Sequence, residues 1–128
     1  MSCPPLAAMR WLVDGMNVIG SRPTGWWRDR RGAMRELVER LDAFARSTGD
    51  DVAVVLDGAP FALSAEHAEV AFASRRGRDA ADDDIAARAE AGMTVVTSDR
   101  ELARRSVERG AQVVGAGEFL RRLDDVTT

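Results

Sequence analysis

A chain of 128 residues with a net charge of −3, 45% hydrophobic and 30% charged residues has the composition of a globular protein, and we expect a single domain over residues 1–128. No apolar run approaches the roughly 18 residues that span a bilayer, and no signal peptide is predicted, so we expect a cytoplasmic protein without membrane association. The single cysteine excludes an internal disulfide, the single histidine argues against Ser-His-Asp catalysis and multi-imidazole metal sites, and the absence of lysine excludes Schiff-base chemistry.

Apolar segments alternate with amphipathic helical patterns along the chain, which predicts an α/β fold with a central parallel sheet. Strands are predicted at residues 10–14, 51–57, 69–74, 94–97 and 112–114. A loop is predicted after the first strand, through Gly15, Gly20 and Gly25, and the stretch 61–67 is ambiguous. Helices are predicted at about 30–46, 82–91, 100–109 and 118–123. The right-handed crossover rule then predicts the strand order 3-2-1-4-5, with a switch point between the first and fourth strands.

Four aspartates lie at or just beyond the ends of apolar runs. Asp14, Asp57 and Asp99 follow predicted strands, and Asp82 opens a predicted helix. A single aspartate in such a place is usually a turn former or a helix cap. Four carboxylates at one edge of a sheet would repel one another unless a cation neutralised them, and their oxygens suit Mg²⁺ or Mn²⁺. We therefore predict a metal site formed by Asp14, Asp57, Asp82 and Asp99.

Helix geometry ranks the carboxylates of the acidic run around Asp82. Asp82 lies three residues before Ile85, so it shares the face that packs on the sheet and can point over the sheet edge. Asp84 lies four residues before Arg88, which predicts an ion pair on the surface. Asp83 is expected to support the site, either beside the ligands or as one of them. The helix dipole alone also favours acidic residues here, with or without a role in chemistry.

Two polar residues near the aspartates have both structural and functional interpretations. Asn17 can position the loop, hold a water or phosphate oxygen, or form an asparagine turn. Ser98 with Glu101 matches a capping box, although the Ser98 hydroxyl can also contact water at the metal site. We count Asn17 and Ser98 as supporting residues.

The arginines gather in two groups that flank the acidic residues in the sequence. Arg75, Arg76 and Arg78 lead directly to the acidic helix, and we expect them to clamp the phosphates of RNA rather than form a solvated loop. The other group, Arg28, Arg30 and Arg31, directly follows Trp26 and Trp27. Tandem tryptophans are more often core or interface residues but can also stack on an unpaired base. An acidic centre between basic segments suits a phosphodiester substrate held by arginines and cut at metal ions.

Four motifs follow one another along the chain: Leu12-Val13-Asp14-Gly15-Met16-Asn17, Leu56-Asp57-Gly58, the helix start at Asp82, and Thr97-Ser98-Asp99. Together they resemble the NYN branch of the PIN-like nuclease superfamily, particularly its bacterial YacP-like members, over roughly residues 12–119. The resemblance implies a three-layer α/β/α PIN-like (Rossmann-like) fold and a metal-dependent ribonuclease. It also implies metal-binding roles for Asp14, Asp82 and Asp99, with Asp57 in the acidic site and Asn17 in support.

The resulting prediction is a Mg²⁺- or Mn²⁺-dependent endoribonuclease acting on single-stranded or loop RNA, with Asp14, Asp82 and Asp99 as catalytic residues. The alternative is a non-catalytic module of the same fold that binds RNA or associates with the ribosome. Receiver domains and haloacid dehalogenase-like phosphatases also place aspartates at strand ends. Both usually require a lysine near the phosphate, which this chain lacks.

Overall fold

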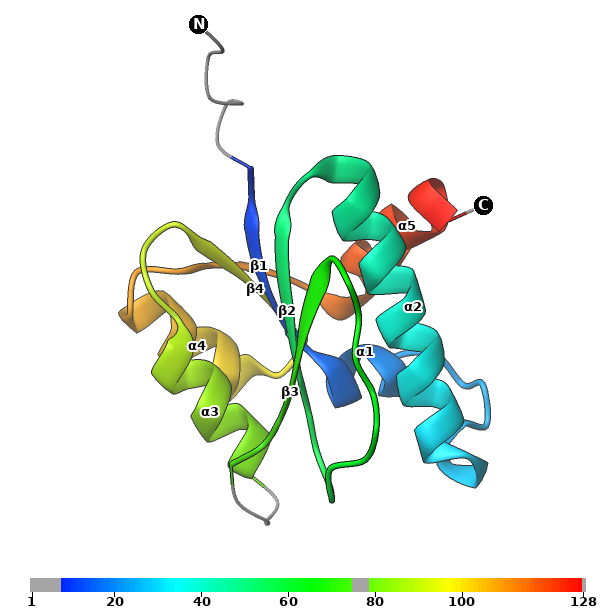
Figure 1. Cartoon of the computed structure of the whole chain (residues 1–128). Helices are drawn as coiled ribbons and strands as arrows, with labels where there is room; N and C mark the ends of the chain where they lie inside the picture. The colour runs from blue at the N-terminus through cyan, green and yellow to red at the C-terminus, as the bar shows by residue number, and fades with distance from the viewer. Residues whose placement is uncertain (1–7, 75–78, 128) are drawn as a thin grey trace, which may run out of the picture.

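The structure of the protein, a computed structural model, describes residues 8–74 and 79–127. Its strands are β1 (Arg10–Asp14), β2 (Asp51–Leu56), β3 (Ala68–Phe72), β4 (Met93–Val96) and β5 (Gln112–Val114). They form a parallel sheet in the order β3-β2-β1-β4-β5, which confirms the predicted fold class and strand order (Figure 1). The strand order changes direction between β1 and β4, so the switch point of the sheet lies there.

Helices cover both faces of the sheet and complete three layers. One layer contains α1 (Gly15–Gly20), α2 (Arg30–Thr48) and α5 (Ala116–Thr127), with the short 3-10 helix η1 (Trp26–Arg28) between the first two. The other layer contains α3 (Ala80–Arg88) and α4 (Arg100–Glu108). Figure 1 shows the two layers on opposite sides of the strands. Within the described part of the chain, no helix combines the length and the apolar character needed to cross a membrane.

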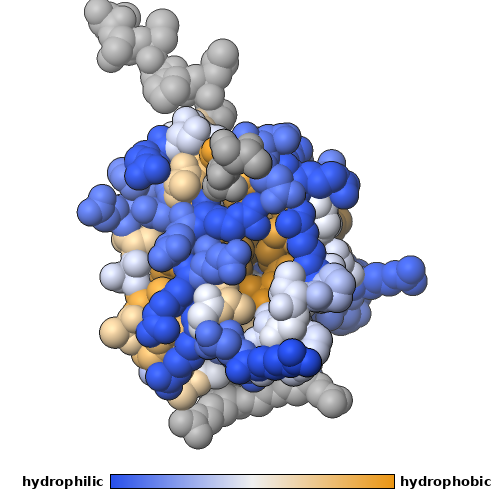
Figure 2. Space-filling view, turned by 90° about the vertical axis from the view of Figure 1, so that its right-hand side faces the viewer, coloured by the Kyte–Doolittle hydropathy of each residue, from blue (hydrophilic) through white to orange (hydrophobic). Residues whose placement is uncertain are grey.

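Alternating strand residues supply two hydrophobic cores, one on each face of the sheet. In β1, Trp11 and Val13 belong to the core under α2 and α5, whereas Leu12 belongs to the core under α3 and α4. Trp11 packs against Phe44 of α2 and Phe119 of α5, with ring centroids 6.0 and 5.1 Å apart. These rings fasten both helices to the first strand. The outward side of this helical layer is mostly hydrophilic, with hydrophobic side chains in patches (Figure 2).

The predicted loop after the first strand is wrong at residues 15–20, which form α1. Glycines at both ends of this short segment lower its helix propensity, so the sequence pattern indicates a loop. Tertiary packing overrides that propensity because Val18 is buried in the core. Gly15 is required where α1 leaves β1, since a Cβ there would lie 2.5 Å from Leu56 Cδ2 of β2.

Other boundaries differ from the prediction by a few residues. β3 begins one residue earlier and ends two residues earlier than predicted, and no helix or strand forms at residues 61–67. α3 begins two residues before Asp82 and ends at Arg88, because Ala89 has an extended backbone with a ψ of 134°. α5 is longer than predicted at both ends. Such differences arise where local pattern is weakest, at the ends of elements.

Candidate active site

The switch point of the sheet brings together two of the predicted aspartates. β1 and β4 pair in parallel up to Val13 and Val96. Asp14 is the last residue of β1, and Asp99 follows β4 as the N-cap residue of α4. Asp82 lies in the first turn of α3, which packs beside α4 in the same helical layer. Ligands of open α/β folds bind at this edge of the sheet.

Thr97, which is not among the predicted site residues, links Asp14 to Asp99. Its Oγ1 donates a hydrogen bond to Asp14 Oδ2 at 3.0 Å and accepts the backbone N–H of Asp99 at 3.1 Å. The side chain is buried, one step beyond the pairing of Val13 with Val96. The signal in the sequence is a hydroxyl residue directly after a strand, in register with Asp14. Thr97 therefore sets the orientation of the Asp14 carboxylate.

Asp14 carries its carboxylate in an environment that disfavours negative charge. The residue is 5% exposed, and its pKa is raised from 3.8 to about 6, chiefly because of burial. The carboxylates of Asp82 and Asp99 contribute to this increase, whereas the Thr97 hydroxyl and the backbone N–H of Asn17 oppose it. Negative charges on three different elements therefore act on one another at this edge.

Asp82 is partly buried and belongs to the same electrostatic group. Its pKa is raised by burial first and then by the carboxylates of Asp99 and Asp79. The nearby guanidinium of Arg105 lowers this pKa. Asp82 is thus close enough to Asp99 for the Asp99 carboxylate to disfavour the ionised form of Asp82.

The donor set of this site suits a hard divalent cation in its chemistry. Carboxylate oxygens are the ligands that Mg²⁺ and Mn²⁺ prefer, and a cation would relieve the repulsion among Asp14, Asp82 and Asp99. Across residues 8–74 and 79–127, however, no three His, Cys, Asp or Glu side chains are placed to hold one ion together. The carboxylates interact through their charges without forming a ready-made ligand cage.

Asn17 and Ser98 hold the loop after β4. Asn17 Oδ1 accepts the backbone N–H of Ser98 at 2.8 Å, and Ser98 Oγ accepts the backbone N–H of Ala116 at 3.0 Å. The predicted capping box at Ser98 is wrong: Asp99 Oδ1 caps α4 instead, because it accepts the N–H of Leu102 at 3.0 Å. The Ser98 hydroxyl is engaged with the start of α5, on the other face of the sheet.

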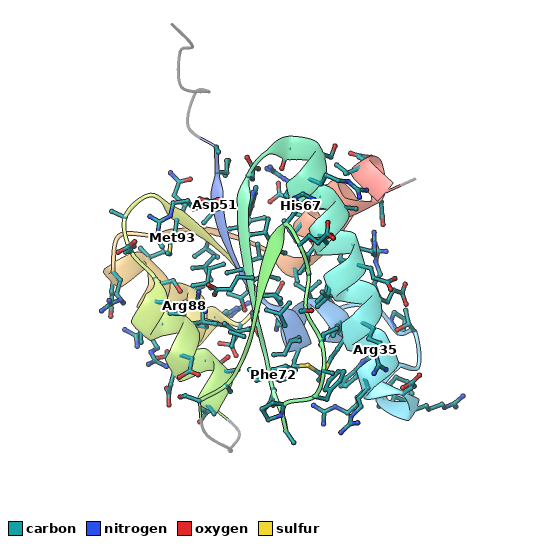
Figure 3. The ribbon with its side chains drawn as sticks, in the orientation of Figure 1. Arg35, Asp51, His67, Phe72, Arg88 and Met93 are labelled. Atoms are coloured by element: carbon teal, nitrogen blue, oxygen red, sulfur yellow. The ribbon has the colours of Figure 1, made fainter. Side chains whose placement is uncertain are left out.

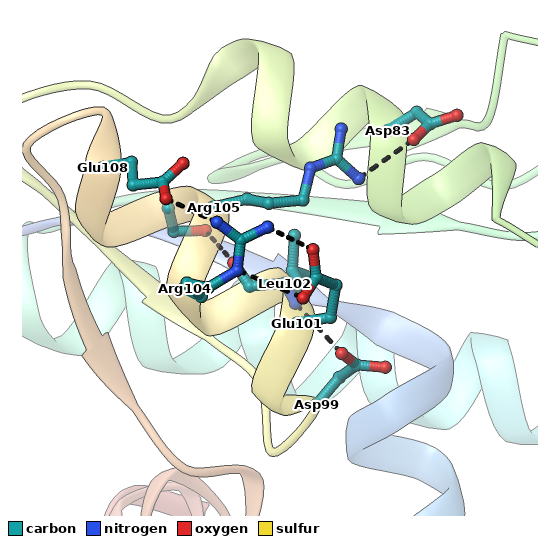
Figure 4. A network of polar contacts seen from close by, with 8 residues as sticks. Asp83, Asp99, Glu101, Leu102, Arg104, Arg105 and Glu108 are labelled. Carbon is teal, nitrogen blue, oxygen red and sulfur yellow. Dashed lines mark hydrogen bonds and ion pairs between the residues drawn. The ribbon is translucent and has the colours of Figure 1, made fainter.

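The remaining acids of the α3 run make structural contacts. Asp83 forms an ion pair with Arg105 of α4, with 3.0 Å between Oδ1 and Nη1 (Figure 4). Asp84 accepts hydrogen bonds from the backbone N–H and the hydroxyl of Ser74, at 2.6 and 2.8 Å. The predicted pairing of Asp84 with Arg88 is wrong, because Arg88 pairs with Glu69 of β3. Asp83 and Asp84 tie α3 to its neighbours.

Asp57 follows β2, which adjoins β1 on the side away from β4, and its side chain is half-buried. The carboxylates that raise the pKa of Asp14 are Asp82 and Asp99. The candidate site therefore centres on Asp14, Asp82 and Asp99.

The predicted phosphate clamp of Arg75, Arg76 and Arg78 lies outside the described residues.

Comparisons with known proteins place this arrangement in a family. The profile of the YacP-like NYN domain matches residues 11–128. Two crystal structures, of Rae1 (YacP) from Bacillus subtilis and of a single-residue variant of it, are each 25% identical to this chain, with TM-scores of 0.74 and 0.76. The similarity covers 92% and 93% of this chain and 75% and 77% of those chains. A search of curated proteins finds no match. The chain belongs to the YacP-like NYN domain family, a nuclease-like branch of the PIN-like superfamily.

Proposed function

We propose that this protein is a metal-dependent endoribonuclease that hydrolyses phosphodiester bonds of single-stranded or loop RNA at the acidic edge of its sheet. The observation that carries the proposal is the state of Asp14. This buried carboxylate forms no ion pair within the described residues, and burial and two other carboxylates raise its pKa to about 6. Such an arrangement costs stability, and strongly shifted pKa values concentrate at functional sites.

Asp14, Asp82 and Asp99 would hold Mg²⁺ or Mn²⁺. Divalent ions bound there would supply Lewis-acid activation of water and stabilise the charge that develops on the phosphodiester. Thr97 orients Asp14 by donating to Oδ2. Asp99 uses Oδ1 to cap α4, and Figure 4 shows its other oxygen pointing away from the helix. The carboxylates of Asp14 and Asp99 are thus each held by a hydrogen bond while they keep oxygen lone pairs for a ligand.

The test is cleavage of a labelled single-stranded RNA in the presence of Mn²⁺. Asp14→Asn and Asp99→Asn should each lower the cleavage rate by roughly a hundredfold or more, because a bound ion supplies several kcal/mol of transition-state stabilisation. Asparagine keeps an acceptor oxygen at both positions and is also a good N-cap residue, so both variants should fold. Asp125→Asn, at an exposed aspartate of α5, is the matched control.

Undiminished cleavage by both site variants would show that the assigned site is wrong. RNA binding without any metal-stimulated cleavage by the wild-type protein would favour the non-catalytic RNA-binding or ribosome-associated alternative. Metal binding measured by calorimetry separates these outcomes, because a nuclease of this kind must bind the ion and the alternative need not.

A further inference from the structure

A surface of aromatic rings and arginines lies beside the first two helices of the chain. It comprises Trp26 and Trp27 of η1, Arg30, Arg31 and Arg35 of α2, and Phe61 of the irregular segment after β2. We call these six residues the arginine–aromatic surface. The proposed nuclease site does not use any of them.

The tryptophans divide into one anchoring ring and one presented ring. The ring centroids of Trp26 and Trp27 lie 6.1 Å apart with the planes at 85°. Trp26 is half-buried against the end of α1, where its Cζ2 lies 3.8 Å from the position of a Cβ at Gly20. Trp27 is 58% exposed, in contrast to Trp11 of the core at 3%. The indole of Trp27 is thus accessible to a ligand and does not pack in the hydrophobic core.

The arginines of this surface lie over the aromatic rings. The Cζ atoms of Arg31 and Arg35 lie 4.8 and 5.1 Å from the ring centroid of Phe61, and that of Arg30 lies 6.0 Å from the ring of Trp26. Stacking of this kind keeps a guanidinium in place while its N–H groups can still donate to another partner.

The positive charges of this surface are not neutralised within the described residues. Arg30, Arg31 and Arg35 form no ion pair there, whereas other arginines of the chain do, including Arg10, Arg22, Arg40, Arg88, Arg104 and Arg105. Two acids adjoin these arginines in sequence, Asp29 and Glu36. Asp29 caps α2 by accepting the N–H of Gly32 at 3.0 Å, and Glu36 forms no ion pair with the three arginines within the described residues. A polyanion is therefore the complementary partner.

The surface lies at the same end of the molecule as the acidic edge of the sheet. Phe61 packs against Phe72, the last residue of β3, with 5.6 Å between ring centroids. Figure 3 shows Phe72 and Arg35 at the end of the molecule where β3 ends. α1 starts directly after Asp14 and leads towards η1 (Figure 1). A strand of nucleic acid on this surface would therefore lie near the carboxyl ends of the strands.

We propose that the arginine–aromatic surface binds single-stranded RNA next to the acidic site, with an unpaired base stacked on Trp27 and phosphates held by Arg30, Arg31 and Arg35. The naming of RNA as the ligand rests on the proposed function, whereas the stacking and charge argument rests on the surface itself. Single strands are selected because a duplex keeps its bases inside and cannot offer one to an indole.

The test measures binding alone, by fluorescence anisotropy of a labelled oligouridine of about 12 nucleotides in EDTA. Trp27→Ala should weaken binding about tenfold, because stacking on one aromatic ring is lost. Trp27→Phe should restore most of the affinity, since it keeps an aromatic face. The matched control is Val107→Ala, at a side chain of α4 that is 59% exposed. Trp27 is a surface residue, so its loss should leave the circular dichroism spectrum unchanged.

A second arm tests the arginines through salt dependence. Arg31→Gln should weaken binding and lower the slope of log affinity against log salt concentration by about 0.7, the value for one phosphate contact on a single strand. Arg46→Gln is the control, because Arg46 is exposed on the last turn of the same helix, away from the rings. It should leave the slope unchanged.

These outcomes are independent of cleavage, because no divalent ion is present. Weaker binding by Trp27→Ala and Arg31→Gln supports the surface even if Asp14→Asn cleaves normally and the nuclease proposal fails. Wild-type affinity in both variants overturns the surface and leaves the nuclease proposal intact. The surface proposal is also wrong if the substitutions weaken binding of a fully paired RNA duplex to the same extent as binding of the single strand.

Discussion

The hydroxyl of Thr97 donates a hydrogen bond to the carboxylate of Asp14, with 3.0 Å between Oγ1 and Oδ2. Asp14 is the last residue of β1 and Thr97 directly follows β4, the adjacent strand, and both side chains are buried. This hydrogen bond lowers the pKa of Asp14 against the effect of burial. The contact therefore orients the carboxylate and partly offsets the effect of burial on its pKa.

Thr97→Val should raise the pKa of Asp14 above its wild-type value of about 6, because the hydrogen bond favours the ionised carboxylate. It should also lower the free energy of unfolding by about 1 kcal/mol, the net value of a buried hydrogen bond. NMR titration of the Asp14 carboxyl carbon and urea unfolding measure the two effects. Thr97→Ser, which keeps the hydroxyl, should behave like the wild type. A pKa in Thr97→Val equal to or below the wild-type value would contradict the role assigned to Thr97.

Asp14 also makes stability depend on pH. The pKa is about 6 in the folded protein and 3.8 as the reference value, so between these values the folded state binds more protons than the unfolded state. The free energy of unfolding should therefore fall as pH rises from about 4 to 6, and the penalty persists above that range. At about 1.4 kcal/mol per pKa unit, it amounts to roughly 3 kcal/mol.

Asp14→Asn removes this penalty, so it should be more stable than the wild type at pH 7.5 by up to about 3 kcal/mol. The difference should shrink towards zero near pH 4, where folded wild-type Asp14 is protonated. Urea unfolding in EDTA at both pH values measures it, and Asp125→Asn should show no such trend. A variant less stable than the wild type at pH 7.5 would argue against an unfavourable charge at Asp14.

Metal binding should reverse the penalty at Asp14. At a free Mn²⁺ concentration about a hundred times the dissociation constant, the wild-type protein should gain about 2.7 kcal/mol in free energy of unfolding. Thermal unfolding with and without Mn²⁺ at pH 7.5 measures this gain as a rise in Tm. The rise should be absent in Asp14→Asn and present in Asp125→Asn. An equal rise in all three proteins would indicate binding elsewhere.

Gly15→Ala should destabilise the fold by about 1–3 kcal/mol, the usual cost of overpacking. Its Cβ would lie 2.5 Å from Leu56 Cδ2 and 3.0 Å from the carbonyl oxygen of Val55, at the point where β1 passes into α1. Gly20→Ala is the matched control within the same helix, because its Cβ meets only Trp26, at 3.8 Å. The control should be neutral or slightly stabilising, since alanine is the better helix former. Equal urea midpoints for the two variants would refute the tight contact.

Features that depend on long apolar patterns are predictable from the sequence. The strand order follows from alternating strand and helix patterns combined with a handedness rule. Parallel strands end at one edge, so the meeting of Asp14 and Asp99 follows from their positions after strands. The ranking of Asp82 above Asp83 follows from helical periodicity, and the structure places Asp83 in an ion pair with Arg105.

Features that depend on contacts between distant segments are not predictable in this way. α1 forms because Val18 is buried, although its glycines favour a loop. Ser98 and Asp99 are both good capping residues; Asp99 caps α4, whereas the Ser98 hydroxyl accepts the N–H of Ala116, 18 residues along the chain. Thr97 gains its role from a strand partner more than 80 positions away along the chain. In each case the contact is with a residue distant in sequence, which the spacing of nearby residues does not reveal.

The short segment Thr97-Ser98-Asp99 bonds to four separate elements: Thr97 to β1, Ser98 to α1 and α5, and Asp99 to α4. Local opening of any one of these elements would remove part of the support of this segment. Detachment of α5 alone would remove the hydrogen bond from the N–H of Ala116 to Ser98, whereas the link from Thr97 to Asp14 and Asp99 does not involve α5. The acidic centre therefore depends on contacts from the sheet and from both helical layers, and not on the three residues of the segment alone.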